Sequence, residues 1–297
     1  MTLEPISFIG LGEIGYPVAG HLATQGRAMI VYNRTPAKSE RWCAQHGGSA
    51  ASSAAEAANG SSVIFICVGD DNDVLDVILG RNGVINTVEE GAVVVDHTTA
   101  SASIAQQVAQ ALAEKGVGFL DAPVSGGSVG AQKGVLSVMV GGDESTFTAV
   151  QPLMQCYSSK QSLMGPIGSG QMTKMVNQIL IASVVQGLAE GIHFGQTLGL
   201  DMERVLQVLA GGAAQSWQLE NRGPTMLQRK FDFGFAVDLI RKDLSICLNE
   251  ARRRGATLPI TAIIEQFYAN LQARGLGGDD FTRLLSLLES SNGSKNV

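Results

Sequence analysis

The chain has 297 residues, of which 45% are hydrophobic and 16% charged, so it can bury a sizeable core and is not a disordered protein. Its formal net charge of −6 argues against a general binder of nucleic acid or of anionic membranes, because such proteins carry a basic excess. The cysteines and histidines show no metal-ligand spacing, so we expect no metal site. No apolar run reaches the roughly 18 residues of a membrane span, and the first residues carry no targeting pattern. We therefore expect a cytoplasmic protein.

Short apolar runs typical of β-strands alternate with helical stretches up to about residue 164. These runs cover residues 6–10, 28–33, 63–69, 92–98, 118–123 and 136–142. Alternation of apolar strands with helices favours a mostly parallel sheet with helices on both faces. We therefore predict an α/β Rossmann-like domain over residues 1–164.

The sequence is helical from about residue 165 onward. Residues 171–198 are apolar nearly all round, and a helix of that kind must be buried between two domains or two subunits. Asp201 is a good N-cap for the next helix, and a later one ends in arginines and Gly255. We predict an all-helical domain over residues 165–297, joined to the first domain by a long buried helix, and a homodimer or homotetramer.

A glycine-rich turn follows the first predicted strand and precedes the first predicted helix. Its glycines have the spacing G-x-G-x-x-G, in which the first makes the tight turn, the second lets a pyrophosphate approach, and the third lets helix and strand pack closely. The helix N-terminus then faces the phosphates. The predicted cofactor-binding loop consists of Gly10, Leu11, Gly12, Glu13, Ile14 and Gly15.

The end of the second predicted strand indicates which dinucleotide binds. An acidic residue there would bind the ribose 2′-hydroxyl of NAD, but the sequence has Asn33, Arg34 and Thr35, with no carboxylate before Glu40. Arg34 can meet a 2′-phosphate with charge-assisted hydrogen bonds, and its two neighbours can add neutral ones. NADP(H) is therefore favoured over NAD(H).

Lys174 is the unusual residue of the long apolar helix. An ammonium group out of water is costly, so this lysine is at the surface, paired, or kept for chemistry. Asn177 and Gln178 follow three and four residues later and share its helical face. A buried lysine can exchange a proton with a hydroxyl or a carbonyl near neutral pH, so Lys174 is a candidate general acid/base.

Two further features are candidate substrate contacts. Ser125, together with the backbone N–H groups of Gly126 and Gly127, follows a predicted strand and could hold a carboxylate in the crevice at the sheet edge. Lys242 lies in the helical half, where its spacing alone is more typical of a solvated helix lysine.

The chain resembles the β-hydroxyacid dehydrogenase family, which includes 3-hydroxyisobutyrate dehydrogenase and tartronate semialdehyde reductase. The resemblance covers nearly the whole length through "FIGLGEIG", "YNRT", "DAPVSGG", "GSGQMTKMVNQ" and "RKDL". It implies that Lys174 is the general acid/base and that the Ser125 loop binds the substrate carboxylate. It also implies that Lys242 lies near nicotinamide and substrate, and that Val68 and Thr99 contact the cofactor.

Two positions depart from the family pattern. Ile14 replaces a common methionine, which should be harmless. Many members have asparagine at the fourth position after the lysine, where this chain has Gln178, so either Asn177 or Gln178 fills the substrate-binding role.

The predicted function is hydride transfer between NADP(H) and a small 3-hydroxy acid or semialdehyde acid, in a cleft between the domains. An imine reductase is the first alternative, but such enzymes usually lack the lysine. A catalytically silent dinucleotide-binding scaffold is the second, and 6-phosphogluconate dehydrogenase itself is much longer than this chain.

Overall fold

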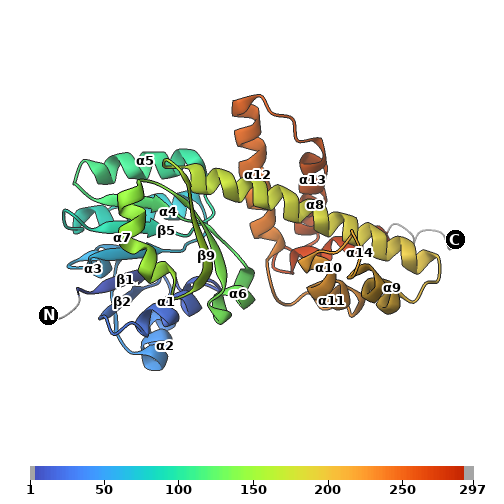
Figure 1. The fold of residues 1–297 in the computed structure, drawn as a ribbon, viewed down its shortest axis with the longest axis horizontal. Helices are drawn as coiled ribbons and strands as arrows, with labels where there is room; N and C mark the ends of the chain where they lie inside the picture. Colours follow the sequence, from blue (N-terminus) through green and yellow to red (C-terminus); the bar gives the residue numbers. More distant parts are fainter. Residues whose placement is uncertain (1–3, 291–297) are drawn as a thin grey trace. The chain divides into compact units, whose positions relative to one another are not determined.

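The computed structural model describes residues 4–290 (Figure 1). The chain divides into two compact units, unit 1 up to Lys174 and unit 2 from Met175 onward. The division falls within a single helix, α8 (Ser169–Thr197).

The centre of unit 1 is one sheet, which has nine strands among the described residues. Its first six strands in chain order lie in the sheet as β3-β2-β1-β4-β5-β6 and all pair in parallel, which is the strand order of a dinucleotide-binding sheet. This confirms the mostly parallel sheet. The strands are β1 (Ile6–Ile9), β2 (Met29–Tyr32), β3 (Ser49–Ala50), β4 (Val63–Ile66), β5 (Val93–Asp96), β6 (Gly118–Asp121), β7 (Val124–Ser125), β8 (Leu136–Gly141) and β9 (Ser158–Gly165).

The remaining strands extend the sheet beyond β6. β8 pairs antiparallel with β6 and β7, and parallel with β9. The sequence did not single out β9, because most of its side chains are polar and few are buried. A strand that does not enter the core lacks the apolar pattern on which such a prediction depends.

Helices cover both faces of this sheet (Figure 1). One core holds Phe8, Trp42 and Tyr157 among its largest side chains, and the other includes Ile64 and Val94. Because both faces are covered, the central strands are mostly apolar, as their sequences predicted. The helices of unit 1 are α1 (Gly15–Ala23), α2 (Pro36–His46), α3 (Ala54–Ala58), α4 (Asp71–Leu79), the 3₁₀ helix η1 (Val84–Asn86), α5 (Ala102–Ala113), α6 (Gly127–Lys133) and α7 (Glu144–Met154).

The regular elements described in unit 2 are all helices. Asp201 caps the second of them by accepting the N–H of Arg204, and Gly255 ends a later one with a positive φ of 70°, so both sequence predictions are confirmed. After α8, the helices of unit 2 are α9 (Met202–Leu209), α10 (Trp217–Asn221), α11 (Gly223–Leu227), α12 (Val237–Arg254), α13 (Pro259–Ala273), the 3₁₀ helix η2 (Phe281–Leu284) and α14 (Leu285–Ser290).

Helix α8 is long and apolar enough to cross a membrane by length and composition alone. It nevertheless packs one face into the core of unit 2, through residues that include Ala182, Val185 and Ile192. The sequence predicted burial all round, but the single chain also leaves apolar side chains exposed, among them Leu180 and Phe194. In this chain α8 is therefore a core helix with one unburied apolar face.

Candidate functional site

The three glycines of the loop between β1 and α1 have different surroundings. A Cβ on Gly10 would collide with the carbonyl oxygen of Cys67, and φ at this residue is 96°. A Cβ on Gly15 would collide with the carbonyl oxygen of Gly10, whereas one on Gly12 would meet nothing within 4 Å. Gly10 and Gly15 are thus required for packing, and Gly12 leaves space where a pyrophosphate can approach the backbone.

Hydrogen bonds fix this loop against the end of β2. Leu11 donates its N–H to Oδ1 of Asn33 at 2.9 Å, and Asn33 Nδ2 donates to the carbonyl of Thr35 at 3.2 Å. The Asn33 side chain therefore joins the two predicted cofactor-binding segments. Glu13 is exposed, while Ile14 packs in part against the core.

Arg34 extends from the same segment and is 83% exposed. It forms an ion pair with Asp73 of α4, with 2.9 Å between Nη1 and Oδ1. An exposed ion pair is worth at most about 1 kcal/mol, so Arg34 can exchange this partner for an anionic ligand. Asp73 also accepts the N–H of Gly69.

A cavity of about 680 Å³ lies beside the glycine loop, within unit 1. Gly12 lines it, together with Lys38 and Arg41 of α2. The Arg41 guanidinium stands over the Tyr16 ring, 4.8 Å from its centroid. Lys38 was not among the predicted site residues, although its position three residues after Thr35 places it in the first turn of α2.

Two other predicted cofactor contacts follow the neighbouring strands β4 and β5. Val68 donates its N–H to Oγ1 of Thr98 at 3.0 Å, and Thr98 donates its own N–H to Asp96. Thr99 is the next residue and is partly buried. The structure thus brings Val68 and Thr99 to one edge of the sheet, with Thr98 as the link that the sequence analysis missed.

Lys174 lies at the predicted carboxylate-binding loop. Its Nζ donates a hydrogen bond to the carbonyl oxygen of Val124 at 2.8 Å, and the residue is only 8% exposed. Val124 directly precedes Ser125 in β7. Gly126 and Gly127 follow with φ values of 132° and 61°, at the start of α6, where backbone N–H groups are suited to an anion.

A polar cluster in unit 2, partly buried at Asn177 and Lys242 and buried at Gln178 and Asp243, contains the other predicted substrate contacts. Gln178 Nε2 donates to Oδ2 of Asp243 at 2.6 Å, and Lys242 Nζ lies 3.1 Å from Oδ1 of the same carboxylate. Asn177 donates to Oε1 of Gln178 at 2.7 Å. Asp243, which is 2% exposed, was missed by the sequence analysis, although it directly follows Lys242.

Two buried titratable groups, His97 and Asp121, lie at the ends of β5 and β6 in unit 1. Burial lowers the pKa of His97 to about 4, so near neutral pH it is an uncharged ring between the Ala122 carbonyl and the Tyr157 hydroxyl. Burial raises the pKa of Asp121 to about 6, although hydrogen bonds from backbone N–H groups such as that of Gly168 act in the opposite direction. Asp121 is the last residue of β6, and His97 directly follows β5, so both lie where these strands lead into the predicted site loops.

The sequence matches two family models that together span nearly the whole chain. Residues 5–168 match the NAD binding domain of 6-phosphogluconate dehydrogenase, and residues 168–288 match the NAD-binding domain of NADP-dependent 3-hydroxyisobutyrate dehydrogenase. The chain belongs to the β-hydroxyacid dehydrogenase family. Its members are NAD(P)-dependent oxidoreductases, and this chain is one of them.

Family relatives match along nearly their full lengths. An uncharacterized oxidoreductase of Shewanella frigidimarina is 51% identical, over 97% of this chain and 99% of that protein. The 2-hydroxy-3-oxopropionate reductase of Escherichia coli is 36% identical, over 96% and 97%. Among solved structures, a 3-hydroxyisobutyrate dehydrogenase from Salmonella typhimurium is 26% identical with a TM-score of 0.88, over 96% of this chain and all of that one.

The residues of unit 1 fit the dinucleotide that the β-hydroxyacid dehydrogenase family uses. The open backbone at Gly12 and the N-terminus of α1 suit a pyrophosphate, and Arg34 and Lys38 supply cations near the end of β2. Among residues 4–290, no group of three or more His, Cys, Asp or Glu side chains could hold a metal ion.

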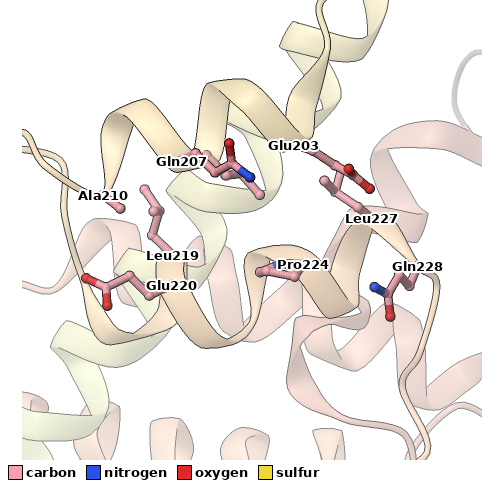
Figure 2. Close-up of a pocket in the computed structure, with 9 residues that line it drawn as sticks. Glu203, Gln207, Ala210, Leu219, Glu220, Pro224, Leu227 and Gln228 are labelled. Atoms are coloured by element: carbon pink, nitrogen blue, oxygen red, sulfur yellow. The ribbon is translucent and has the colours of Figure 1, made fainter.

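A second cavity, of about 350 Å³, lies in unit 2 among α9, α10 and α11. Figure 2 shows that side chains of α9, such as Glu203 and Gln207, and of α10 and α11, such as Leu219 and Leu227, surround it. None of the predicted site residues lines this cavity. It is therefore separate from the site that the dehydrogenase motifs predict.

Proposed function

We propose that this chain is an NADP(H)-dependent oxidoreductase that transfers a hydride between nicotinamide and the hydroxyl-bearing carbon of a small 3-hydroxy acid or its semialdehyde. The observation that carries the proposal is the position of Lys174, a buried amine bonded to Val124 beside the Ser125 loop. A proton-transfer group next to a candidate carboxylate site is what this reaction requires.

The proposed chemistry divides between the cofactor and the chain. The nicotinamide, when bound, supplies or accepts the hydride. Lys174 takes the hydroxyl proton when the alcohol is oxidised and returns it to the carbonyl oxygen when the aldehyde is reduced. In this proposal the N–H groups of Gly126 and Gly127, with Ser125, hold the substrate carboxylate. Lys242 and one of the two amides, Asn177 or Gln178, are the further substrate contacts.

The preference for NADP(H) is supported by the cations near the end of β2. Arg34 is exposed and forms a surface ion pair with Asp73, and Lys38 lies in the adjacent first turn of α2. Asp73 opposes this preference, because its carboxylate repels a 2′-phosphate. Replacing Arg34 by Gln should therefore raise the KM for NADPH by roughly tenfold and leave that for NADH nearly unchanged.

We expect reduction of the semialdehyde in the cell, because cells usually maintain a supply of NADPH. The name of the Escherichia coli relative, 2-hydroxy-3-oxopropionate reductase, supports a semialdehyde acid as the substrate class. The proposal is tested by initial rates with NADPH and NADH on succinic, tartronate and methylmalonate semialdehydes, glyoxylate and a cyclic imine.

Lys174→Ala is measured in parallel, with Lys160→Ala on the exposed strand β9 as the matched control. Turnover of a semialdehyde acid that is lost by about 100-fold or more in Lys174→Ala and kept in the control supports the proposal. Turnover of the imine alone would favour an imine reductase. Tight NADPH binding without turnover of any acid would favour a scaffold.

A further inference from the structure

Gln171 is a buried residue of α8 whose side-chain amide forms hydrogen bonds through both its oxygen and its nitrogen. Its Oε1 accepts the N–H of Ala100 at 3.0 Å, and its Nε2 donates to the carbonyl of Thr98 at 2.7 Å. The residue is 1% exposed and stands three positions before Lys174, on the same helix and within unit 1. One amide thus joins the start of the lysine helix to the loop between β5 and α5.

That loop, residues 97–101, is the β5–α5 loop, and it contains Thr99, a predicted cofactor contact. Thr98 also accepts the N–H of Val68, the other predicted contact of this edge. Gln171 therefore holds the backbone on both sides of Thr99, and through Thr98 it is connected to Val68.

The main chain of Gln171 is fixed as firmly as its side chain. Asp121 accepts the N–H of Gln171 at 2.8 Å through one oxygen and that of Gly168 at 2.7 Å through the other. A Cβ on Gly170 would collide with the carbonyl oxygen of Asp121, so the helix start lies directly against the sheet. Side chain and backbone of Gln171 are therefore both anchored to the sheet edge where the cofactor contacts lie.

We infer that Gln171 is a positioning residue, which fixes the position of the β5–α5 loop relative to the amine of Lys174. This inference rests on the proposed function. Hydride and proton must be exchanged with one carbinol group, so the cofactor and Lys174 need a fixed separation, and a displacement of about 1 Å can cost about 100-fold in rate. A buried amide with both ends bonded provides that rigidity, whereas a side chain needed only for stability would affect folding and not the rate of turnover.

The first test replaces Gln171 by Met, which has similar size but leaves the Ala100 N–H and the Thr98 carbonyl unsatisfied. We expect kcat to fall by about 10- to 100-fold, while KM for the acid stays within about threefold, because the carboxylate-binding loop is unchanged. Gln186→Met is the matched control. Gln186 is also a buried glutamine of α8, 8% exposed and bonded to Glu190 at 2.7 Å, but it is in unit 2, and its replacement should leave kcat unchanged.

The second test is Gln171→Glu, which gives a signature that loss of stability would not. A protonated Glu can accept from Ala100 and donate to Thr98, as the amide does, but an ionised one can only accept. The ratio of kcat in Gln171→Glu to that in the parent should therefore fall as pH rises through the pKa of the introduced carboxyl. The ionisable groups that face this network are Asp121, Asp96, His97, Lys174 and Asp71, which accepts the Ser101 N–H. They are present in both proteins, so a pH effect confined to the variant comes from the introduced carboxyl and its coupling with them.

The outcomes separate this inference from the proposed function. A folded Gln171→Met with parental kcat, or a flat ratio for Gln171→Glu, would overturn the positioning role. If Gln171→Met does not fold, the pH dependence of the kcat ratio between Gln171→Glu and the parent is the deciding test of the positioning role. A parent that turns over no acid would contradict the proposed function instead. Titration with NADPH, followed by fluorescence, then tests whether Gln171 positions residues 97–101 for the cofactor. Gln171→Met should weaken NADPH binding at least about threefold, and unchanged binding would overturn the inference as well.

Discussion

Asp243 is a buried carboxylate that serves two proposed substrate-binding residues at once. Its oxygens lie 2.6 Å from Gln178 Nε2 and 3.1 Å from Lys242 Nζ. Replacing it by Asn keeps one acceptor for Gln178 and removes the charge that holds Lys242. Replacing it by Ala removes both and leaves the Gln178 amide without this acceptor.

We therefore expect kcat/KM to fall by roughly tenfold in Asp243→Asn and further in Asp243→Ala, since a hydrogen bond to a charged group contributes about 1.5–3 kcal/mol. A double-mutant cycle with Lys242→Ala measures the coupling. Strictly additive effects of the two substitutions would show that Asp243 does not act through Lys242.

His97 makes stability depend on pH. Because burial lowers the pKa of His97 to about 4 in the folded state, the unfolded chain binds a proton to this ring at a higher pH than the folded chain does. The free energy of unfolding of the parent should therefore fall by about 3 kcal/mol more than that of His97→Gln between pH 7 and pH 4. Denaturant titrations at several pH values measure this difference.

Asp121 contributes with the opposite sign. Its pKa is raised to about 6, so it favours the folded state at low pH and loses that contribution as pH rises through 6. It is present in both the parent and His97→Gln, so only the difference between the two proteins isolates His97. Parallel pH profiles of the two proteins would contradict a neutral buried ring.

The turn between β1 and α1 allows a comparison within one element. Gly10→Ala adds a Cβ against the Cys67 carbonyl at a positive φ, and should destabilise the protein by about 2–4 kcal/mol. Gly12→Ala adds a Cβ into open space. It should change the free energy of unfolding by less than about 1 kcal/mol but weaken NADPH binding by about tenfold or more, since the methyl group holds the pyrophosphate away.

Thermal unfolding without cofactor and NADPH titration of the folded variants measure these two effects. Equal destabilisation by both substitutions would contradict the different surroundings of the two glycines. Unchanged NADPH affinity of Gly12→Ala would mean that the pyrophosphate does not approach the backbone at this residue.

The elements that sequence analysis predicted well are those whose pattern has a local cause. The central parallel strands are mostly apolar because both faces are covered. Asp201 and Gly255 mark helix ends by their own chemistry. β9 was missed because it buries few side chains. A strand that is held by pairing with its neighbour and buries few side chains lacks the apolar pattern from which strands are predicted.

The predicted site shows the same division. The glycine loop and Lys174 were found because glycine spacing and a lysine in an apolar helix are visible locally. Gln171 and Asp243 were not found, because their importance lies in partners 65 or more residues away in the sequence. A buried glutamine or aspartate looks like any polar residue until the fold places its partner.

At the scale of the whole molecule, helix α8 leaves an apolar face exposed in the single chain. Val176, Leu180, Val184 and Phe194 lie at helical spacing along α8, and Leu198 directly follows its end. Each of these side chains is more than a third exposed in the single chain. Exposed apolar surface of this extent usually marks an interaction site, because its burial is favourable by about 25 cal/mol per Å². We therefore expect a second copy of the chain to cover this face, in a homodimer or homotetramer.

The expected assembly is tested by light scattering of the parent and of a Leu180→Glu, Phe194→Glu double variant. The parent should have the mass of two or four chains, and the double variant that of one, because two buried carboxylates without partners are too costly for an interface. Gln196→Glu, on an exposed position of the same helix, is the matched control and should keep the parental mass. A parent that is monomeric at micromolar concentration, or a double variant with unchanged mass, would show that something other than a second copy covers this face.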